Sequence, residues 1–215
     1  YQHAKGALPP LEIYEAGHPV LDANSVAATA RAIDMVKDLG QDDTVLFLIS
    51  GGGSALFEKP LIPLSELQKI NSDLLSSGAD IVSMNTVRKR FSAVKGGKFA
   101  QICAPAKVYA IVLSDIIGDP LDMIASGPAY PDTSTREDAQ KVIERYKVIL
   151  SPEAEACLAV ETPKRLDHVE TVVTGSVTEL AKAGKKAAEA LGYQTHILTS
   201  SLCLLYTSPS PRDTR

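Results

Sequence analysis

The chain has 215 residues, of which 45% are hydrophobic and 22% are charged, so it holds enough apolar material to form a globular core. Its formal net charge of -4 gives no electrostatic reason to expect nucleic acid or an anionic membrane as a partner. The cysteines lie far apart and show no Cys-x-x-Cys spacing, which argues against a disulfide framework and a zinc site. No apolar run reaches the roughly 18 residues that a membrane span needs, and no secretory signal opens the chain. We therefore expect a cytoplasmic protein.

Strand-like and helix-like segments alternate along the chain. Strand-like segments are expected at 11–16, 44–50, 107–114, 170–175 and 194–199; the second is continuously apolar and β-rich, and we expect the second and third to be covered on both faces. Apolar residues at helical spacing predict the helices between them, which we expect to begin at Asn24 or Ser25, at a Ser65–Gln68 capping box, at Thr135 with Asp138, at Ser151–Pro152 and at Val177. This alternation indicates an α/β fold, a Rossmann-like three-layer domain with a parallel sheet. Ligands of such sheets bind at the carboxyl ends of the strands.

Three consecutive glycines, Gly51, Gly52 and Gly53, follow the strand expected at 44–50 and precede Ser54. Because glycine has no Cβ, this backbone can turn sharply and present several N–H groups to an anion. The loop is not a Walker A motif, since no Gly-Lys-Ser/Thr follows, and it matches neither GxGxxG nor GxSxG. The alternative interpretation is a tight strand-to-helix turn that binds nothing.

A second loop, after the strand expected at 107–114, places Asp115 and Asp119 on either side of Gly118. Carboxylates at the carboxyl end of a strand can coordinate Mg²⁺ or accept a proton from a substrate hydroxyl in phosphoryl transfer. Asp115 is our first choice for this base or metal ligand. The alternative is that both aspartates only cap turns.

Cationic side chains concentrate in a third segment. Asn85, Arg88 and Lys89 fall at i, i+3 and i+4, so that a helix would present them on one face, and Lys95 and Lys98 flank a pair of glycines. In a net acidic chain this concentration predicts a binding site for a carboxylate or a phosphate. The alternative is a charged face that is merely solvated.

Four segments together resemble the glycerate 2-kinase family, the type whose C-terminal half is called the MOFRL domain. They are YEAGHPVLD (14–22), DTVLFLISGGGSALF (43–57), NTVRKRFSAVKGGKFA (85–100) and LSDIIGDPLDMIASGPAYPDTST (113–135), in the same order as in the family. The likeness covers nearly all of residues 1–202. It departs from the family pattern at Arg90, where histidine is common, and at Phe91, where leucine is usual. The first block contains His18, which by itself we interpret as structural.

The resemblance implies an enzyme that uses ATP and Mg²⁺ to phosphorylate the small molecule D-glycerate at its 2-hydroxyl, with no nucleic acid or membrane partner. The site residues it implies belong to the glycine-rich loop, the NTVRK segment and the loop at the strand end: Gly51, Gly52, Gly53, Ser54, Asn85, Arg88, Lys89, Ser114, Asp115, Gly118 and Asp119. The active site would lie in a cleft between this domain and the C-terminal domain of the same protein.

Relative to that family, both ends of the chain are expected to be incomplete. Residues 1–202 would form the N-terminal kinase domain without its first strand and helix, and the MOFRL domain would be absent, so we expect the chain alone to be inactive. Residues 203–215 resemble the translation of a sequencing-library adaptor and are expected not to belong to the enzyme. Two alternative functions stay open: a hydroxypyruvate reductase, although no GxGxxG with a following acidic residue is visible, and a non-catalytic anion-binding α/β domain.

Overall fold

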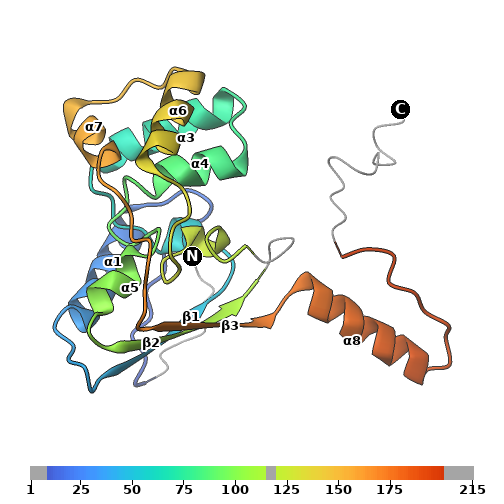
Figure 1. Ribbon diagram of the computed structural model, residues 1–215. Coiled ribbons are helices and arrows are strands. Elements are labelled where there is room, and N and C mark those ends of the chain that lie inside the picture. The colour runs from blue at the N-terminus through green and yellow to red at the C-terminus, as the bar shows by residue number, and fades with distance from the viewer. Residues whose placement is uncertain (1–8, 115–119, 201–215) are drawn as a thin grey trace, which may run out of the picture.

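The chain folds around a parallel sheet of three strands in the order β1-β2-β3 (Figure 1). The computed structural model describes residues 9–114 and 120–200. The strands are β1 (Thr44–Ile49), β2 (Lys107–Leu113) and β3 (Val169–Gly175), all rich in the β-branched residues that suit a pleated surface. The structure confirms the expected α/β fold class with a parallel, incomplete sheet.

Two helices cover one face of this sheet, α1 (Ala23–Val36) and α5 (Lys98–Cys103) (Figure 1). Three phenyl rings fill the space between helices and strands: Phe47, Phe57 and Phe99 lie with their ring centroids 4.8 to 5.5 Å apart. Burial of such rings is a large apolar contribution to stability. This layer holds the strands in place beneath the loops that follow them.

The opposite face of the sheet is open in the described part of the chain. Leu46 and Leu48 of β1 are 62% and 67% exposed, whereas Ile49 is buried. Leu113 and Val172, on the neighbouring strands, are also exposed. The expectation that the strand at 44–50 is covered on both faces is therefore wrong here, because the described helices that pack on the sheet lie on one face only.

Four further helices form a separate hydrophobic core next to the sheet (Figure 1): α3 (Leu64–Ser76), α4 (Ile81–Arg88), α6 (Arg136–Tyr146) and α7 (Pro152–Leu158). The predicted helix starts at Thr135 and Ser151 are confirmed, since both hydroxyls accept a hydrogen bond from the backbone of the first turn. The centre of this core is fully apolar and contains Leu67, Ile70, Leu74, Val87 and Phe91.

Two short elements join the sheet to the helical core. Helix α2 (Gly53–Leu56) follows β1, and the 3-10 helix η1 (Ile124–Ser126) lies in the segment after β2. The two elements are in contact with each other. Because both follow the carboxyl ends of parallel strands, they lie at the position where α/β sheets bind ligands.

Helix α8 (Val177–Ala190) follows β3 and leads away from the rest of the fold (Figure 1). It begins after Ser176, in agreement with the prediction, but none of its residues is buried. Its leucine Leu180 is 74% exposed. Neither α8 nor any other helix of the described residues is long and apolar enough to cross a membrane.

Two predicted strands are not formed. Residues 11–16 run without strand pairing, and Glu12 instead forms an ion pair of 2.7 Å with Arg31 of α1. Residues 194–199 follow the helix that leads away from the sheet, so no neighbouring strand of the described chain satisfies their backbone. An apolar, β-branched run becomes a strand only where a partner strand is in reach.

Two helix starts also differ from the prediction. Helix α1 begins after Asp22, whose carboxylate accepts a hydrogen bond from the Ser25 backbone N–H, and not after Asn24 or Ser25. Helix α3 begins after Pro63 without a side-chain cap. The expected capping box there is not formed, because the Gln68 amide donates to a main-chain carbonyl that precedes α1.

Candidate active site

The glycine-rich loop turns directly from β1 into α2. Gly52 has φ 84°, in the left-handed region that favours glycine. A Cβ on Gly53 would lie 2.6 Å from the Cβ of Ala125, so a larger residue there would push the loop away from η1. The sequence Gly52–Gly53 therefore allows a sharp turn and a close approach of two backbone segments.

The segment facing this loop has an unusual backbone. Ala125, Ser126 and Gly127 are consecutive residues with φ of 51°, 62° and 63°. Left-handed conformations at alanine and serine are strained, and such strain is concentrated at functional sites in proteins. The conformation aims the Ser126 hydroxyl, which is fully buried, toward α4.

Polar side chains from three separate segments meet at this point. The Ser126 hydroxyl donates to Asn85 Oδ1 at 2.9 Å, and it lies 3.4 Å from the hydroxyl of Ser54. Asn85 also donates to the sulfur of Met123 at 3.3 Å. The structure thus brings together Ser54 and Asn85, which the sequence singled out in separate motifs.

Arg88 extends from the last turn of α4 to the glycine-rich loop. Its Nη2 donates to the Ser54 carbonyl at 3.1 Å, while its Nε is buried without a hydrogen-bond partner. Burial lowers the pKa of Arg88, and the charge of Glu58, which forms its ion pair with Lys95 and none with Arg88, opposes this shift. A cation that is largely removed from water and forms no ion pair of its own among the described residues is costly, so this geometry favours an anionic ligand.

Lys95 is buried under the same loop and does not face solvent. Its Nζ donates to the carbonyls of Ser54, Phe57 and Ala125 at 2.9, 3.3 and 3.5 Å, and it lies 3.6 Å from Glu58 Oε2. Burial lowers the pKa of Lys95 to about 8, although the charge of Glu58 opposes this shift. Lys95 therefore connects α2 to η1. We had expected this cation to be directed at a ligand, and the structure shows that it is bound within the protein instead.

Lys98 is likewise occupied within the protein. Its Nζ donates to three main-chain carbonyls, those of Lys89, Arg90 and Ser92, at 2.9, 3.3 and 2.7 Å. Burial lowers its pKa to about 8. These contacts fix the turn that leads from α4 into α5, so the pair of lysines around the glycines is structural and does not form an anion site.

Lys89 points away from Asn85 and Arg88, into a buried ionic cluster. Its Nζ lies 3.0 Å from Asp132 and 3.3 Å from Asp122. Arg90 reaches the same Asp132, at 3.7 Å, and also pairs with Glu161. This corrects the expectation that Lys89 shares an anion-binding face with its two neighbours. It also shows that Arg90, a departure from the family pattern, is tied to the core of this protein.

His18 lies beside the glycine-rich loop although we had interpreted it as structural. It is exposed, and its ring atoms Cδ2 and Nε2 are 3.5 and 3.6 Å from the position that a Cβ on Gly52 would occupy. Gly17 and Asp22 hold this segment in place, since the Gly17 N–H donates to Asp22 Oδ2 at 2.9 Å. The signal in the sequence was its place in the first of the four family-like blocks.

The remaining predicted residues are only partly described. Ser114 is buried, and its N–H donates to the Gly175 carbonyl at 2.8 Å, which extends the pairing of β2 with β3. Asp115, Gly118 and Asp119 lie outside the described residues. Within the described ranges no group of three or more histidine, cysteine or acidic residues could hold a metal ion. The residues present therefore fit an anionic group at Arg88, whereas the predicted Mg²⁺ ligand is not among them.

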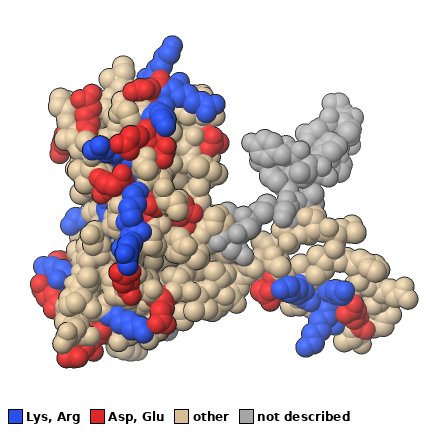
Figure 2. All heavy atoms as spheres, viewed as in Figure 1, with Lys and Arg blue, Asp and Glu red and all other residues tan. Residues whose placement is uncertain are grey.

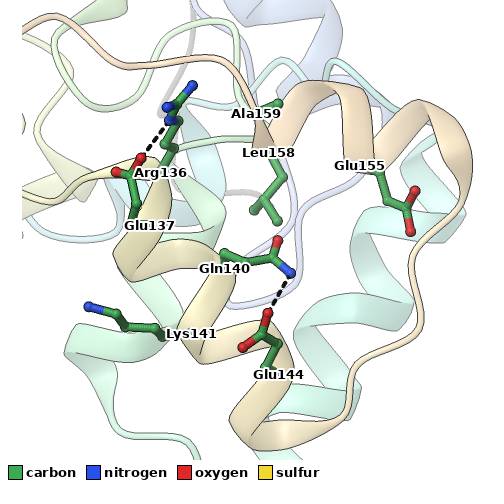
Figure 3. Close-up of a pocket in the computed structure, with 8 residues that line it drawn as sticks. All are labelled: Arg136, Glu137, Gln140, Lys141, Glu144, Glu155, Leu158 and Ala159. Carbon is green, nitrogen blue, oxygen red and sulfur yellow. Dashed lines mark hydrogen bonds and ion pairs between the residues drawn. The ribbon is translucent and has the colours of Figure 1, made fainter.

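A hollow of about 440 Å³ lies away from these loops, between α6 and α7 (Figure 3). Its polar side chains pair mainly with each other: Arg136 with Glu137 at 2.6 Å, and Gln140 with Glu144 at 3.0 Å. Figure 2 shows basic and acidic side chains interleaved over the visible face, so this surface has no field of a single sign. Neither this hollow nor the charged surface brings polar side chains from separate segments together as the loops after β1 and β2 do.

Comparison with known proteins gives a consistent result. A family model described as "Domain of unknown function (DUF4147)" matches residues 1–159. A D-glycerate 2-kinase of Thermotoga maritima is 51% identical over 204 residues, which cover 94% of this chain and 49% of that protein. An Agrobacterium vitis relative, named provisionally as a hydroxypyruvate reductase, is 46% identical over 151 residues, covering 69% of this chain and 39% of that protein.

The fold also matches a solved structure. The crystal structure of glycerate kinase from Thermotoga maritima superposes with a TM-score of 0.89 at 50% identity, covering 92% of this chain and 48% of that one. The chain thus spans about half the length of the Thermotoga maritima glycerate kinase that it matches in sequence and in structure. The resemblance to glycerate 2-kinases that the sequence motifs indicated is confirmed.

Proposed function

Because this chain belongs to the family described as a domain of unknown function (DUF4147), and because its relatives include glycerate kinases, we propose that it is the N-terminal half of an ATP-dependent glycerate 2-kinase. The enzyme would transfer a phosphoryl group to the 2-hydroxyl of D-glycerate. Since the chain spans about half of those relatives, a second, C-terminal MOFRL domain would complete the active site, and this half alone would be inactive. The protein would act in the cytoplasm.

The observation that carries this proposal is the environment of Arg88. Its side chain is partly exposed and has one hydrogen-bond partner, the Ser54 carbonyl; its Nε is buried without a partner, and it forms no ion pair with a carboxylate of the described residues. Phosphoryl transfer depends mainly on positioning and on neutralising charge. Arg88 is suited to both tasks, because a guanidinium binds phosphate or carboxylate oxygens through a fixed fork of donors.

The neighbouring groups complete a ligand-binding arrangement. The backbone of Gly51–Ser54 would approach the anion, and Asn85 with Ser126 would orient it, since their side chains already bond each other at 2.9 Å. Asp115, which follows β2 in the sequence, would serve as the base or as a ligand of Mg²⁺, and Asp119 is the other candidate for this role. A bound Mg²⁺ supplies neutralisation of the phosphate charge.

The test is a coupled assay of ADP release, with D-glycerate as acceptor, on a full-length protein that carries this chain. We expect turnover, and we expect Arg88→Ala to raise the KM for ATP or D-glycerate about tenfold or more, with a smaller effect on kcat. Arg136→Ala is the matched control, because Arg136 is exposed and pairs with Glu137 away from the strand ends. Turnover without any KM change in Arg88→Ala would contradict the proposed role of this guanidinium.

One alternative enzyme is favoured by a specific observation, the provisional name of the Agrobacterium vitis relative as a hydroxypyruvate reductase. A reductase needs a dinucleotide site, and this chain shows no GxGxxG motif. Oxidation of NADH with hydroxypyruvate, in the same full-length protein and without ADP release from ATP and D-glycerate, would decide for that alternative.

A further inference from the structure

A pocket of about 430 Å³ lies between the segment that follows His18 and the helices α3 and α4. Its walls are mainly apolar, with Pro19, Val20, Leu75 and Met84 among the lining residues. Val20 and Leu75 are 65% and 67% exposed, so large apolar side chains on two facing segments present surface to the pocket. The volume is within the range of small-molecule sites, roughly 300–1,000 Å³.

This pocket is continuous with the glycine-rich loop on two sides. Arg88 lines the pocket and also donates to the Ser54 carbonyl at 3.1 Å. Pro19 lines it as well, and the preceding residue, His18, has its ring against Gly52. A ligand with an anionic end at Arg88 can therefore extend its other end into the pocket.

Two polar atoms of the pocket wall have no hydrogen-bond partner in the described structure, Arg88 Nε and Asn71 Oδ1. Leaving a buried polar atom unpaired costs about 1–3 kcal/mol, so both side chains would gain from a small rotation that brings these buried atoms to a partner in the pocket. A carboxamide can present either an acceptor or a donor to a ligand after a rotation of its terminal bond. The wall thus combines a guanidinium with a single carbonyl partner, an amide and apolar surface.

We propose that this pocket receives the base and sugar of the nucleoside triphosphate whose phosphates lie at Arg88 and the glycine-rich loop. The proposal rests on the proposed kinase function and adds the location of the nucleoside. Charge and size favour this occupant: the cation is at one end and the apolar walls at the other, as in a nucleotide. The acid substrate, with three carbons and polar groups on each, could not cover these walls.

The experiment compares the binding of MgATP and of magnesium tripolyphosphate, which lacks a nucleoside, to the 215-residue chain by calorimetry. Leu75→Ala and Ser72→Trp change the pocket at exposed positions of α3, so that both variants are expected to fold. The matched control is Leu180→Ala, which removes a leucine that is 74% exposed on α8. Circular dichroism is the check that the variants keep the wild-type structure.

We expect ATP to bind more tightly than tripolyphosphate. Leu75→Ala should weaken ATP binding about fivefold and Ser72→Trp more than about tenfold, with tripolyphosphate binding unchanged and Leu180→Ala neutral. Equal affinities for ATP and tripolyphosphate, or unaltered ATP binding in both pocket variants, would overturn the nucleoside pocket but leave the phosphate site intact. Failure of both ligands to bind, with no effect of Arg88→Ala on catalysis, would instead remove the proposed function together with the pocket.

Discussion

Replacing Lys95 by methionine removes the buried ammonium group that connects α2 to η1 while keeping a side chain of similar length. In the wild-type protein this group contacts three main-chain carbonyls and the carboxylate of Glu58. Glu58 is itself only 1% exposed, and its second oxygen, Oε1, has no hydrogen-bond partner in the described residues. The substitution therefore leaves a buried carboxylate without its cation.

The expected loss follows from this burial. Removing one partner of a buried ion pair costs about 3–5 kcal/mol, since the other charge stays in a medium that solvates it poorly. We expect the lower end, about 3 kcal/mol, because burial already lowers the pKa of Lys95 from 10.5 to about 8 and so makes its own charge unfavourable. For a chain of this length that loss corresponds to a decrease in Tm of about 6–12 °C.

Thermal unfolding followed by circular dichroism at pH 7 measures this effect. Lys182→Met is the matched control, because Lys182 is 60% exposed on α8. The double variant Glu58→Gln with Lys95→Met should recover much of the lost stability, since it leaves no charge behind. The pKa of Lys95 is lower in the folded protein than in the unfolded chain, so the unfolded chain binds this proton more tightly. The free energy of unfolding of the wild type therefore gains a contribution from Lys95 as the pH rises from about 8 to 10.5. The difference in free energy of unfolding between wild type and Lys95→Met should widen over that range. An unchanged Tm in Lys95→Met, or a double variant as unstable as the single one, would refute this reasoning.

Two further predictions concern carboxylates. In the full-length enzyme, Asp115→Asn should lower kcat by at least about 10²-fold, as expected for loss of a base or metal ligand, and near-normal turnover with unchanged Mg²⁺ dependence would transfer that role to another residue. Asp132→Asn should cost about 3–5 kcal/mol at pH 7, because Lys89 and Arg90 would lose the carboxylate they share. Burial by itself would raise the pKa of Asp132, but Lys89 and the hydrogen bonds of Thr162 hold it below its ordinary value of 3.8. Its stabilising contribution is therefore present above about pH 4 and is lost on further acidification, so denaturant titrations from pH 6 to pH 2 should show a shallower decline for Asp132→Asn than for the wild type.

Local sequence patterns were sufficient for the fold class and for the order of the main elements. The runs at 44–50 and 107–114, which are rich in β-branched residues, form β1 and β2 and pair with each other in parallel. The glycines after β1 permit a turn with positive φ that few other residues could adopt. Helices such as α6 begin where a hydroxyl and an acidic residue can form a capping box. These features depend on neighbours within a few residues, so they can be read from the sequence. The pattern failed at 11–16 and at 194–199, because a strand depends on a partner strand distant in the sequence.

The roles of the cations were decided only by the tertiary structure. The sequence alone does not distinguish four cations, Arg88, Lys89, Lys95 and Lys98. In the described structure Lys89 forms an ion pair with a carboxylate, and Lys95 and Lys98 each donate to several main-chain carbonyls. Arg88 forms no ion pair and donates to one carbonyl, and its Nε has no partner. Lys89 finds its carboxylate 43 residues away, and Lys95 finds a carbonyl 41 residues away. The burial of a charge, and the groups that compensate for it, depend on contacts between segments distant in the sequence. A local sequence pattern does not contain this information.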